Sequence, residues 1–69
     1  MTPNTRSRTN LINARLKLQK TQREVALAAE IERSHYAKIE AGARMPSVDA
    51  AHRIAKALNS SIEHLFFDE

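Results

Sequence analysis

Three polar side chains near the middle of the chain share one side of an expected helix and can form hydrogen bonds with a polar surface. Arg33, Ser34 and Lys38 lie on this side, whereas Tyr36 and Ile39 lie on the apolar side. A helix of this kind fits into the major groove of DNA, where base edges offer hydrogen-bond donors and acceptors. We therefore expect this side of the helix to face the major groove of DNA.

Each of the three also has an alternative role. Arg33 can donate two hydrogen bonds to O6 and N7 of guanine. Alternatively, it contacts a phosphate or is simply solvated. The Ser34 hydroxyl can donate or accept on DNA, or it can complete the start of the helix. Lys38 suits a base and a phosphate equally.

Two neighbouring residues are ambiguous. Glu32 is a further candidate for base contact because its carboxylate can accept a hydrogen bond from a cytosine amino group, although phosphates would repel it. It could also pair with Arg33 or cap the helix, and we favour the cap. His35 is a candidate for contact with the DNA backbone, and simple solvent exposure is at least as well supported.

The elements that must position this helix are also helical. Thr21 and Glu24 have the spacing of a capping box, in which each side chain accepts a hydrogen bond from the other residue's amide. A helix should therefore begin after Thr21. Its inward-facing positions are Val25, Ala26 and Ala29. The next helix, about 33–41, should end at Gly42, which can adopt a left-handed conformation.

A further helix is predicted before this pair, from about Asn10 to Gln19, with Thr9 or Asn10 as its N-cap. Its inner face is predicted to comprise Leu11, Ala14 and Leu18, with Leu16 beside them.

Two more helices are predicted after the pair. One follows Pro46, with Ser47 as its N-cap and Asp49 in its first turn. Its predicted apolar stripe is Val48, Ala51, Ile54, Ala55 and Leu58. Ser61 then caps a short last helix that contains Ile62, Leu65 and Phe66. No alternating strand pattern is present, so the predicted fold class is all-α, with five short helices around a small core.

The composition narrows the class of protein. The chain has 69 residues, enough for one small domain, and no cysteine for a disulfide or a thiolate–metal site. No apolar run approaches the roughly 20 residues that span a bilayer. The N-terminus lacks the apolar stretch of a secretory signal. We therefore expect a soluble, cytoplasmic protein.

Catalytic, cofactor and metal sites are not indicated. No two of His35, His52 and His64 have the i, i+4 spacing of a metal-binding helix, and no nucleophile–base constellation is present. The single glycine excludes a glycine-rich phosphate loop. We expect no enzymatic activity, no cofactor, no metal and no small-molecule ligand.

Positive charge is concentrated in the first two thirds of the chain. Residues 1–44 hold nine basic and four acidic residues, whereas residues 45–69 hold two basic and four acidic residues. This asymmetry suits a polyanion beside the helix pair, and it equally suits a solvated surface. Residues 1–8 are predicted to be a disordered basic arm. Arg6 and Arg8 could follow DNA, but we favour a simple untethered terminus.

These segments together resemble the phage-repressor and Cro-type helix-turn-helix domains, the XRE family. The similarity covers about residues 10–67, through TQREVA, RSHYAKIEAGARMPS, AHRIAKALN and SIEHLF. It implies a compact five-helix, lambda-repressor-like domain over residues 9–69, in which the third helix is the recognition helix.

The resemblance also implies roles for individual residues. The base-reading candidates are Glu32, Arg33, Ser34 and Lys38. For contact with the DNA backbone the resemblance implies Gln22, Ala43 and Arg44, and Arg23 and His35 are further candidates. Gln22 could in addition brace the recognition helix, and Arg15 and Glu40 have the residue types of a structural pair in some members.

The chain departs from the family pattern at two places. Glu30 occupies the turn between the second and third helices, where the family often has Gly, and a positive φ there would cost about 1 kcal/mol. Gln19 and Lys20 replace the usual Gly-Leu pair, which removes a core contact and adds a charge near the expected DNA face.

Phe66 and Phe67 are adjacent, so we expect one to pack inward and the other to be exposed. The predicted dimer interface is Ile62, Leu65, Phe66 and Phe67, because the family usually dimerises near this end; a half-covered core edge is the alternative. The predicted function is a homodimeric, sequence-specific transcriptional repressor that binds an inverted repeat in double-stranded DNA. The alternative is a protein-binding adaptor or antitoxin-type module with weak or no DNA affinity.

Overall fold

The computed structural model describes residues 7–67, and every element within them is helical. The elements are α1 (Thr9–Lys17), α2 (Gln22–Ala28), α3 (Arg33–Glu40), α4 (Val48–Ala57) and the π-helical turn η1 (Glu63–Phe67). The predicted all-α fold class is confirmed. Residues 1–6, which make up most of the predicted arm, lie outside the described residues. Within 7–67, no helix has the length and apolar character needed to cross a membrane.

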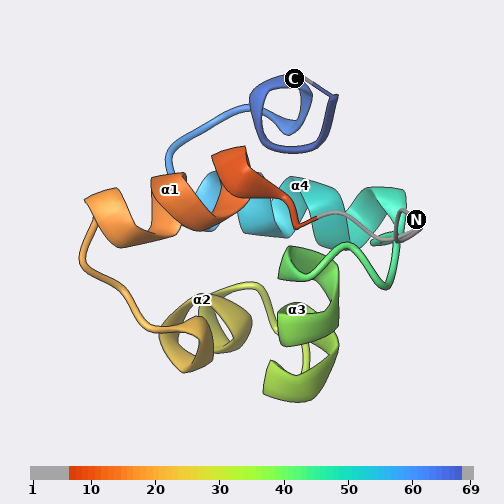
Figure 1. Ribbon diagram of the computed structural model, residues 1–69. Coiled ribbons are helices and arrows are strands. Elements are labelled where there is room, and N and C mark those ends of the chain that lie inside the picture. Colours follow the sequence, from red (N-terminus) through yellow and green to blue (C-terminus); the bar gives the residue numbers. More distant parts are fainter. Residues whose placement is uncertain (1–6, 68–69) are drawn as a thin grey trace.

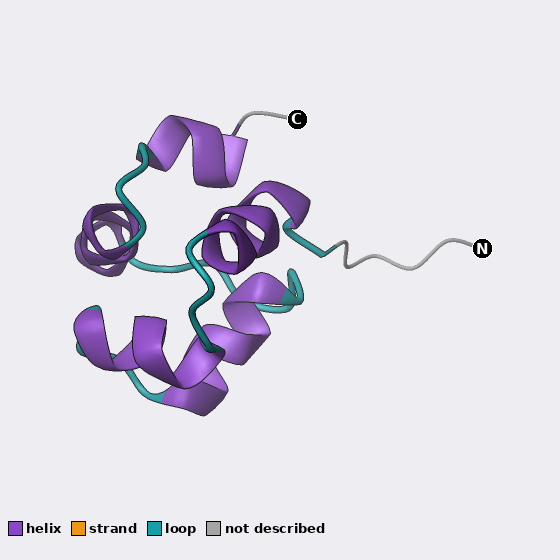
Figure 2. Cartoon of the chain, turned by 90° about the vertical axis from the view of Figure 1, so that its left-hand side faces the viewer, coloured by secondary structure: helices purple, strands orange, loops and turns teal. Residues whose placement is uncertain are grey.

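The helix-turn-helix pair and the C-terminal turn lie on opposite sides of the domain. α1 and α4 lie in the middle, with α2 and α3 on one side and η1 on the other (Figure 1). The view turned by 90° shows the same separation (Figure 2). α2 packs against both α3 and α4, and α1 packs against η1 and α3. A surface on α3 and a surface on η1 are therefore exposed on different sides of the domain.

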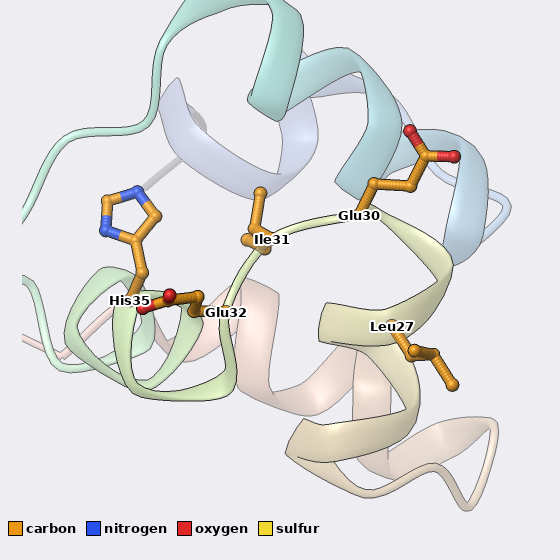
Figure 3. A pocket seen from close by; sticks show the side chains of 5 residues that line it. All are labelled: Leu27, Glu30, Ile31, Glu32 and His35. Carbon is orange, nitrogen blue, oxygen red and sulfur yellow. The ribbon is translucent and has the colours of Figure 1, made fainter.

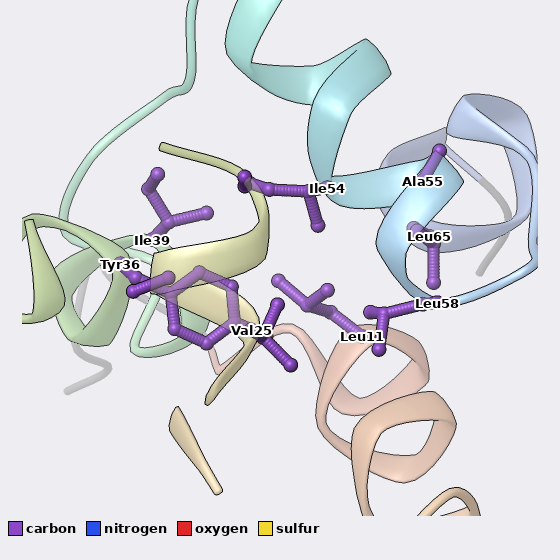
Figure 4. Close-up of a cluster of buried hydrophobic side chains, with 10 residues drawn as sticks. Leu11, Val25, Tyr36, Ile39, Ile54, Ala55, Leu58 and Leu65 are labelled. Carbon is purple, nitrogen blue, oxygen red and sulfur yellow. The ribbon is translucent and has the colours of Figure 1, made fainter. Parts of the chain in front are cut away.

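A single cluster of apolar side chains holds the five elements together (Figure 4). Its buried members are Leu11, Val25, Ala26, Ala29, Tyr36, Ile39, Ile54, Ala55, Leu58 and Leu65. Full burial of one large aliphatic side chain stabilises a fold by about 1.5–3 kcal/mol. The prediction that Tyr36 and Ile39 form the inner face of α3 is confirmed, since both are fully buried.

Local capping signals define three of the helix starts as predicted. The Thr21 hydroxyl accepts from the Glu24 amide at 3.0 Å, and the Glu24 carboxylate accepts from the Thr21 amide at 2.8 Å. The Ser47 hydroxyl accepts from the Ala50 amide at 3.1 Å. The Ser61 hydroxyl accepts from the His64 amide at 3.0 Å. Each cap satisfies an amide that the first helical turn leaves without a partner.

The predicted inner face of the first helix is wrong for two leucines. The helix ends at Lys17 rather than Gln19, so Leu18 lies at the C-cap, outside the helical periodicity, and is exposed. Leu16 follows Leu11 by five residues, which at about 100° per residue places it roughly 140° away, and it is exposed as well. The N-cap position belongs to Arg8, not to Thr9 or Asn10.

The predicted stripe of the fourth helix is wrong at one position. Val48 is the first residue of α4 and is exposed, whereas Ala50 is buried. The other four predicted positions, Ala51, Ile54, Ala55 and Leu58, are buried as expected. The stripe is therefore shifted around the helix, away from the side on which Val48 lies.

Both positions that depart from the family pattern adopt left-handed backbone conformations. Glu30 has φ 61° and Gln19 has φ 59°. Glycine adopts these angles without a steric penalty, whereas a residue with a Cβ pays about 1 kcal/mol or more. The turn at Glu30 thus keeps a glycine-like shape and is mildly strained. Gly42 has φ 82° after α3, as its predicted role requires.

Candidate nucleic-acid interface

The outer face of α3 presents the polar side chains that the sequence singled out. Arg33 and Ser34 are the first two residues of the helix, and Lys38 lies one turn beyond Ser34. All three are exposed, whereas Tyr36, Ile39 and Glu40 on the inner face are buried. The structure therefore brings the three candidate base-reading side chains together on one surface of one helix.

Glu32 occupies the N-cap position of α3, but its carboxylate makes no capping hydrogen bond. The favoured prediction that Glu32 caps the helix through its side chain is therefore wrong. The residue is exposed beside Arg33. Its carboxylate remains available at the end of the helix that we expect to enter the groove.

A buried carboxylate fixes the inner side of α3. Glu40 is only 3% exposed and accepts hydrogen bonds from Arg15 Nε at 2.6 Å and Arg15 Nη2 at 3.2 Å. Gln22 Nε2 donates to the same carboxylate at 2.9 Å. Arg15 Nη1 also donates to the Lys20 carbonyl at 2.9 Å. One carboxylate thus joins α1, α2 and α3, and it sets the orientation of α3 relative to α2.

The hydrogen bonds keep this pair ionised. Burial of Glu40 favours its neutral form, but the hydrogen bonds from Arg15 and Gln22 outweigh that effect and lower the pKa of the carboxyl group. The hydrogen bond to Glu40 raises the pKa of Arg15 in turn. A two-point Arg–carboxylate contact also restricts orientation more strongly than a single hydrogen bond does.

The Tyr36 hydroxyl lies near this network without a hydrogen bond of good geometry among the described residues. Burial is the main reason that the pKa of Tyr36 is raised, and the neighbouring Glu40 carboxylate raises it further. The phenol therefore stays neutral, and Tyr36 acts as a core residue.

The residues expected to contact the DNA backbone flank α3. Arg23 near the start of α2, and Ala43 and Arg44 in the loop after α3, are exposed. The Ala43 and Arg44 amides both donate to the Lys38 carbonyl, at 2.9 and 3.3 Å, which holds the loop at the end of α3. Gln22 is half-buried, and its amide nitrogen braces Glu40. The bracing role that the family resemblance implied for Gln22 is thus present.

An open recess lies at the turn between α2 and α3. It is lined by Leu27, Glu30, Ile31, Glu32 and His35 (Figure 3). Two of these side chains are carboxylates, which would repel phosphates, and His35 is half-buried here rather than fully exposed. The acidic recess therefore borders the basic surface.

Two arginines that the sequence did not mark as structural hold the ends of α2 and α3. Arg53 Nε donates to the Ala29 carbonyl at 2.7 Å, directly before the strained residue Glu30, and Arg53 pairs with Asp49 at 3.4 Å. Arg8 Nη1 donates to the Ile39 carbonyl at 2.6 Å. Only the i, i+4 spacing of Asp49 and Arg53 gave a local signal, because Arg8 lies 31 residues from its partner.

The C-terminal side chains divide between the core and the surface. Leu65 is 2% exposed and belongs to the core, so it differs from the other residues of the predicted dimer interface. Ile62 and Phe66 pack partly against the core, whereas Phe67 is 64% exposed. The expectation that one phenylalanine packs inward and the other does not is met. Ile62, Phe66 and Phe67 are therefore the members of the predicted interface that are at least partly accessible.

Metal binding finds no support in the part of the chain from residue 7 to 67. No three side chains of His, Asp or Glu in that part form a group that could hold an ion.

The chain matches known helix-turn-helix proteins over most of its length. The helix-turn-helix family model HTH_3 matches residues 11–65. An uncharacterised HTH-type transcriptional regulator of Archaeoglobus fulgidus is 36% identical over 63 residues, which cover 90% of this chain and 89% of that protein.

The chain is also similar to solved structures over most of its length. The restriction-modification controller protein C.AhdI of Aeromonas hydrophila is 26% identical with a TM-score of 0.78, over 84% of this chain and 88% of that one. The N-terminal DNA-binding domain of SinR from Bacillus subtilis has a TM-score of 0.80 at 19% identity, over 88% and 90% of the two chains, and supports the fold alone.

Proposed function

The chain belongs to the HTH_3 helix-turn-helix family, and we propose that within it the protein acts as a dimeric repressor at an inverted-repeat operator. Its function is DNA-binding transcriptional regulation, in keeping with its similarity to the regulator of Archaeoglobus fulgidus and to the controller protein C.AhdI. We place it in the cytoplasm, where it would meet its DNA, and assign it no catalytic role.

The observation that supports DNA reading most directly is the two-sided character of α3. Its inner side is fixed by Tyr36, Ile39 and the buried carboxylate of Glu40. Its outer side is exposed and offers hydrogen-bonding groups at the N-terminal end, where recognition helices contact base edges. A helix held this firmly has little orientational freedom to lose when it enters the groove.

In this proposal Arg33 reads a guanine, and Ser34 and Lys38 contact further bases or phosphates, with Glu32 at the edge of the site. Arg23 and Arg44 contact phosphates on either side, while Ala43 lies along the backbone and His35 borders it. Cationic groups on both flanks of a recognition helix fix its register on the duplex.

Two copies would dimerise through the apolar face formed by Ile62, Phe66 and Phe67. A twofold axis there would present two recognition helices to successive major grooves, about 34 Å apart. The exposure of Phe67 supports this face, because covering an exposed aromatic side chain with a partner lowers the free energy of the complex.

DNA binding can be tested with genomic fragments, including the DNA immediately upstream of the coding region. We expect a sequence-selective shift that weakens on the order of a thousandfold between about 50 and 200 mM salt, because phosphate contacts release counterions. A fragment with an inverted repeat should bind best. No selective and salt-sensitive shift with any fragment would refute the proposal.

The reading residue can be tested with Arg33→Ala. Loss of a two-point guanine contact should cost about 1–3 kcal/mol and relax the preference at one base pair of each half-site. Arg44→Ala is the matched control, because loss of a phosphate contact should weaken all sequences alike. Binding selections from a randomised operator library would measure both effects. An unchanged base preference in Arg33→Ala would show that another residue reads that base.

A protein-binding module with little DNA affinity is the second candidate. The acidic recess supports it, since Leu27 is 77% exposed there beside two carboxylates. A protein-binding module does not require cations around one helix. Here Arg23, Arg33, Lys38 and Arg44 surround α3, so we favour DNA binding. The salt-dependent shift described above discriminates between the two functions.

A further inference from the structure

Arg8 contacts three separate parts of the domain. Its backbone amide donates to the Glu40 carbonyl at 2.8 Å, and its Nη1 donates to the carbonyls of Ile39 at 2.6 Å and Arg44 at 2.9 Å. Its Nη2 lies 3.0 Å from Met45 Sδ. The guanidinium carbon lies 5.7 Å from the centre of the Phe66 ring. One side chain therefore connects the end of α3, the following loop and η1.

These contacts complete the C-terminal end of the recognition helix. An α-helix leaves its last four carbonyls without partners inside the helix. In α3, the amides that follow the helix satisfy Ala37, Lys38 and Ile39, the last through Gly42 at 3.1 Å. Arg8 satisfies the fourth carbonyl, that of Glu40, through its amide, and its side chain donates a second, shorter hydrogen bond to Ile39. A cation at this position also interacts favourably with the negative end of the helix dipole.

The contact with Arg44 is the one that bears on DNA. Arg8 Nη1 holds the Arg44 carbonyl, and the Arg44 amide is held by a longer bond of 3.3 Å to the Lys38 carbonyl. Nη1 donates to both carbonyls while Nη2 faces Met45 and the guanidinium lies over the Phe66 ring; an ammonium has enough donors for two carbonyls but lacks the second nitrogen and the plane that lies along the ring. Without Arg8, the backbone of Arg44 would lose its shorter restraint.

We propose that Arg8 is a positioning residue for DNA binding. It does not contact DNA itself but fixes the loop over 41–45 against the end of α3, so that the Arg44 side chain is directed at the phosphate backbone. This inference rests on the proposed function. An ordered loop needs no further ordering when DNA binds, so the contact strengthens binding at Arg44.

The loop itself can be tested on the protein without DNA. In Arg8→Met, we expect the amides of Ala43 and Arg44 to exchange with solvent about tenfold faster, because a charge-assisted hydrogen bond to the loop is lost. Lys56→Met is the matched control, since it removes an exposed cation of α4 by the same change and should leave these amides unaffected. Arg8→Lys should lie between Arg8→Met and the wild type. Unchanged exchange of both amides in Arg8→Met would overturn the proposal.

A double-mutant cycle with Arg44→Met tests the effect on DNA. Arg8→Met should lower operator affinity about tenfold when Arg44 is present and less than about twofold in Arg44→Met, because residues that act as a unit are not additive. An equal loss in both backgrounds would show that Arg8 acts independently, and the positioning role would then be wrong. A slope of log affinity against log salt that falls by about two for Arg8→Met within Arg44→Met, one for each subunit of the dimer, would instead indicate a direct phosphate contact.

The two proposals fail in different ways. A wild-type chain that shows no salt-sensitive DNA binding would refute the proposed function, whatever the exchange of the loop amides. Normal DNA binding together with unchanged loop exchange in Arg8→Met would refute only the role of Arg8. Circular dichroism of each variant, recorded well below its melting temperature, confirms that folded protein is compared.

Discussion

Arg15→Met should be among the most destabilising single substitutions in the described part of the chain. The side chains of Arg15 and Glu40 are only 13% and 4% exposed in their ion pair. Removal of one partner leaves a buried carboxylate with Gln22 as its remaining side-chain donor. Breaking a buried pair on one side costs about 3–5 kcal/mol, because the remaining charge is uncompensated.

This loss is large for a domain of 69 residues. At about 0.05–0.15 kcal/mol per residue, the whole free energy of unfolding is roughly 3–10 kcal/mol. With an m-value near 1 kcal/mol per molar urea, the midpoint of unfolding should fall by about 3–5 M. Urea titrations followed by circular dichroism at pH 7 would measure the shift.

The pH dependence of stability gives a sharper test, because the contribution of Glu40 should have opposite signs in the wild type and in Arg15→Met. In the wild type the pKa of Glu40 is lowered by folding, so this group stabilises the fold above its unfolded pKa, and that stability is lost as pH falls through the folded pKa. In Arg15→Met, burial should dominate and raise the pKa of Glu40 above its unfolded value. The variant should therefore gain stability as pH falls toward about 4 and lose it as pH rises.

The double variant Arg15→Met/Glu40→Met is the control for packing. It removes both charges and should recover most of the lost stability, since an apolar pair can replace a buried ion pair at little cost. Equal losses in the single and double variants would mean that the apolar volume of Arg15 matters rather than its charge. A single variant whose stability falls with acidification, as in the wild type, would refute the electrostatic reasoning.

Phe67→Glu should weaken self-association and operator binding together, while Leu27→Glu, an equally drastic change at a similarly exposed position of α2, should leave the dimer intact. Sedimentation at several protein concentrations would decide, and a Phe67→Glu variant that stays dimeric would exclude this face. Glu30→Gly should stabilise the domain by up to about 1 kcal/mol, since it relieves the left-handed conformation at φ 61°, and should raise the melting temperature by about 4–8 °C. Glu30→Ala keeps the Cβ and should give no such gain, so an equal rise in both variants would assign the effect to the lost charge instead.

Features determined by neighbouring residues could be predicted from the sequence. The Thr21–Glu24 capping box, the Ser47 cap and the end of α3 at Gly42 each depend on hydrogen bonds within a few residues, and each is present. The burial of Tyr36 and Ile39 followed from helical periodicity alone. The periodicity failed at Leu18 because the helix had already ended there.

Contacts between distant segments could not be predicted from local sequence patterns. Arg8 was assigned to the predicted arm, yet it is bound to residues 31 and 36 positions further along the chain. Nothing in the composition of residues 1–8 separates it from Arg6. Arg15 and Glu40 were paired only through the family resemblance, because a separation of 25 residues gives no periodic signal. Contacts of this kind depend on how the helices pack, and that arrangement is not encoded in any short segment.

The two sides of α3 have different roles, and this determines how the domain can change the DNA sequence that it prefers. Its stability depends on the inner side, where Glu40 joins three helices and Tyr36 is fully buried. The candidate reading residues Arg33, Ser34 and Lys38 are exposed, and exposed substitutions usually change stability by less than about 0.5 kcal/mol. Substitutions at these three positions should therefore alter DNA preference without unfolding the domain. Substitutions at Glu40 or its partners should affect folding and DNA affinity together, whatever the sequence of the site.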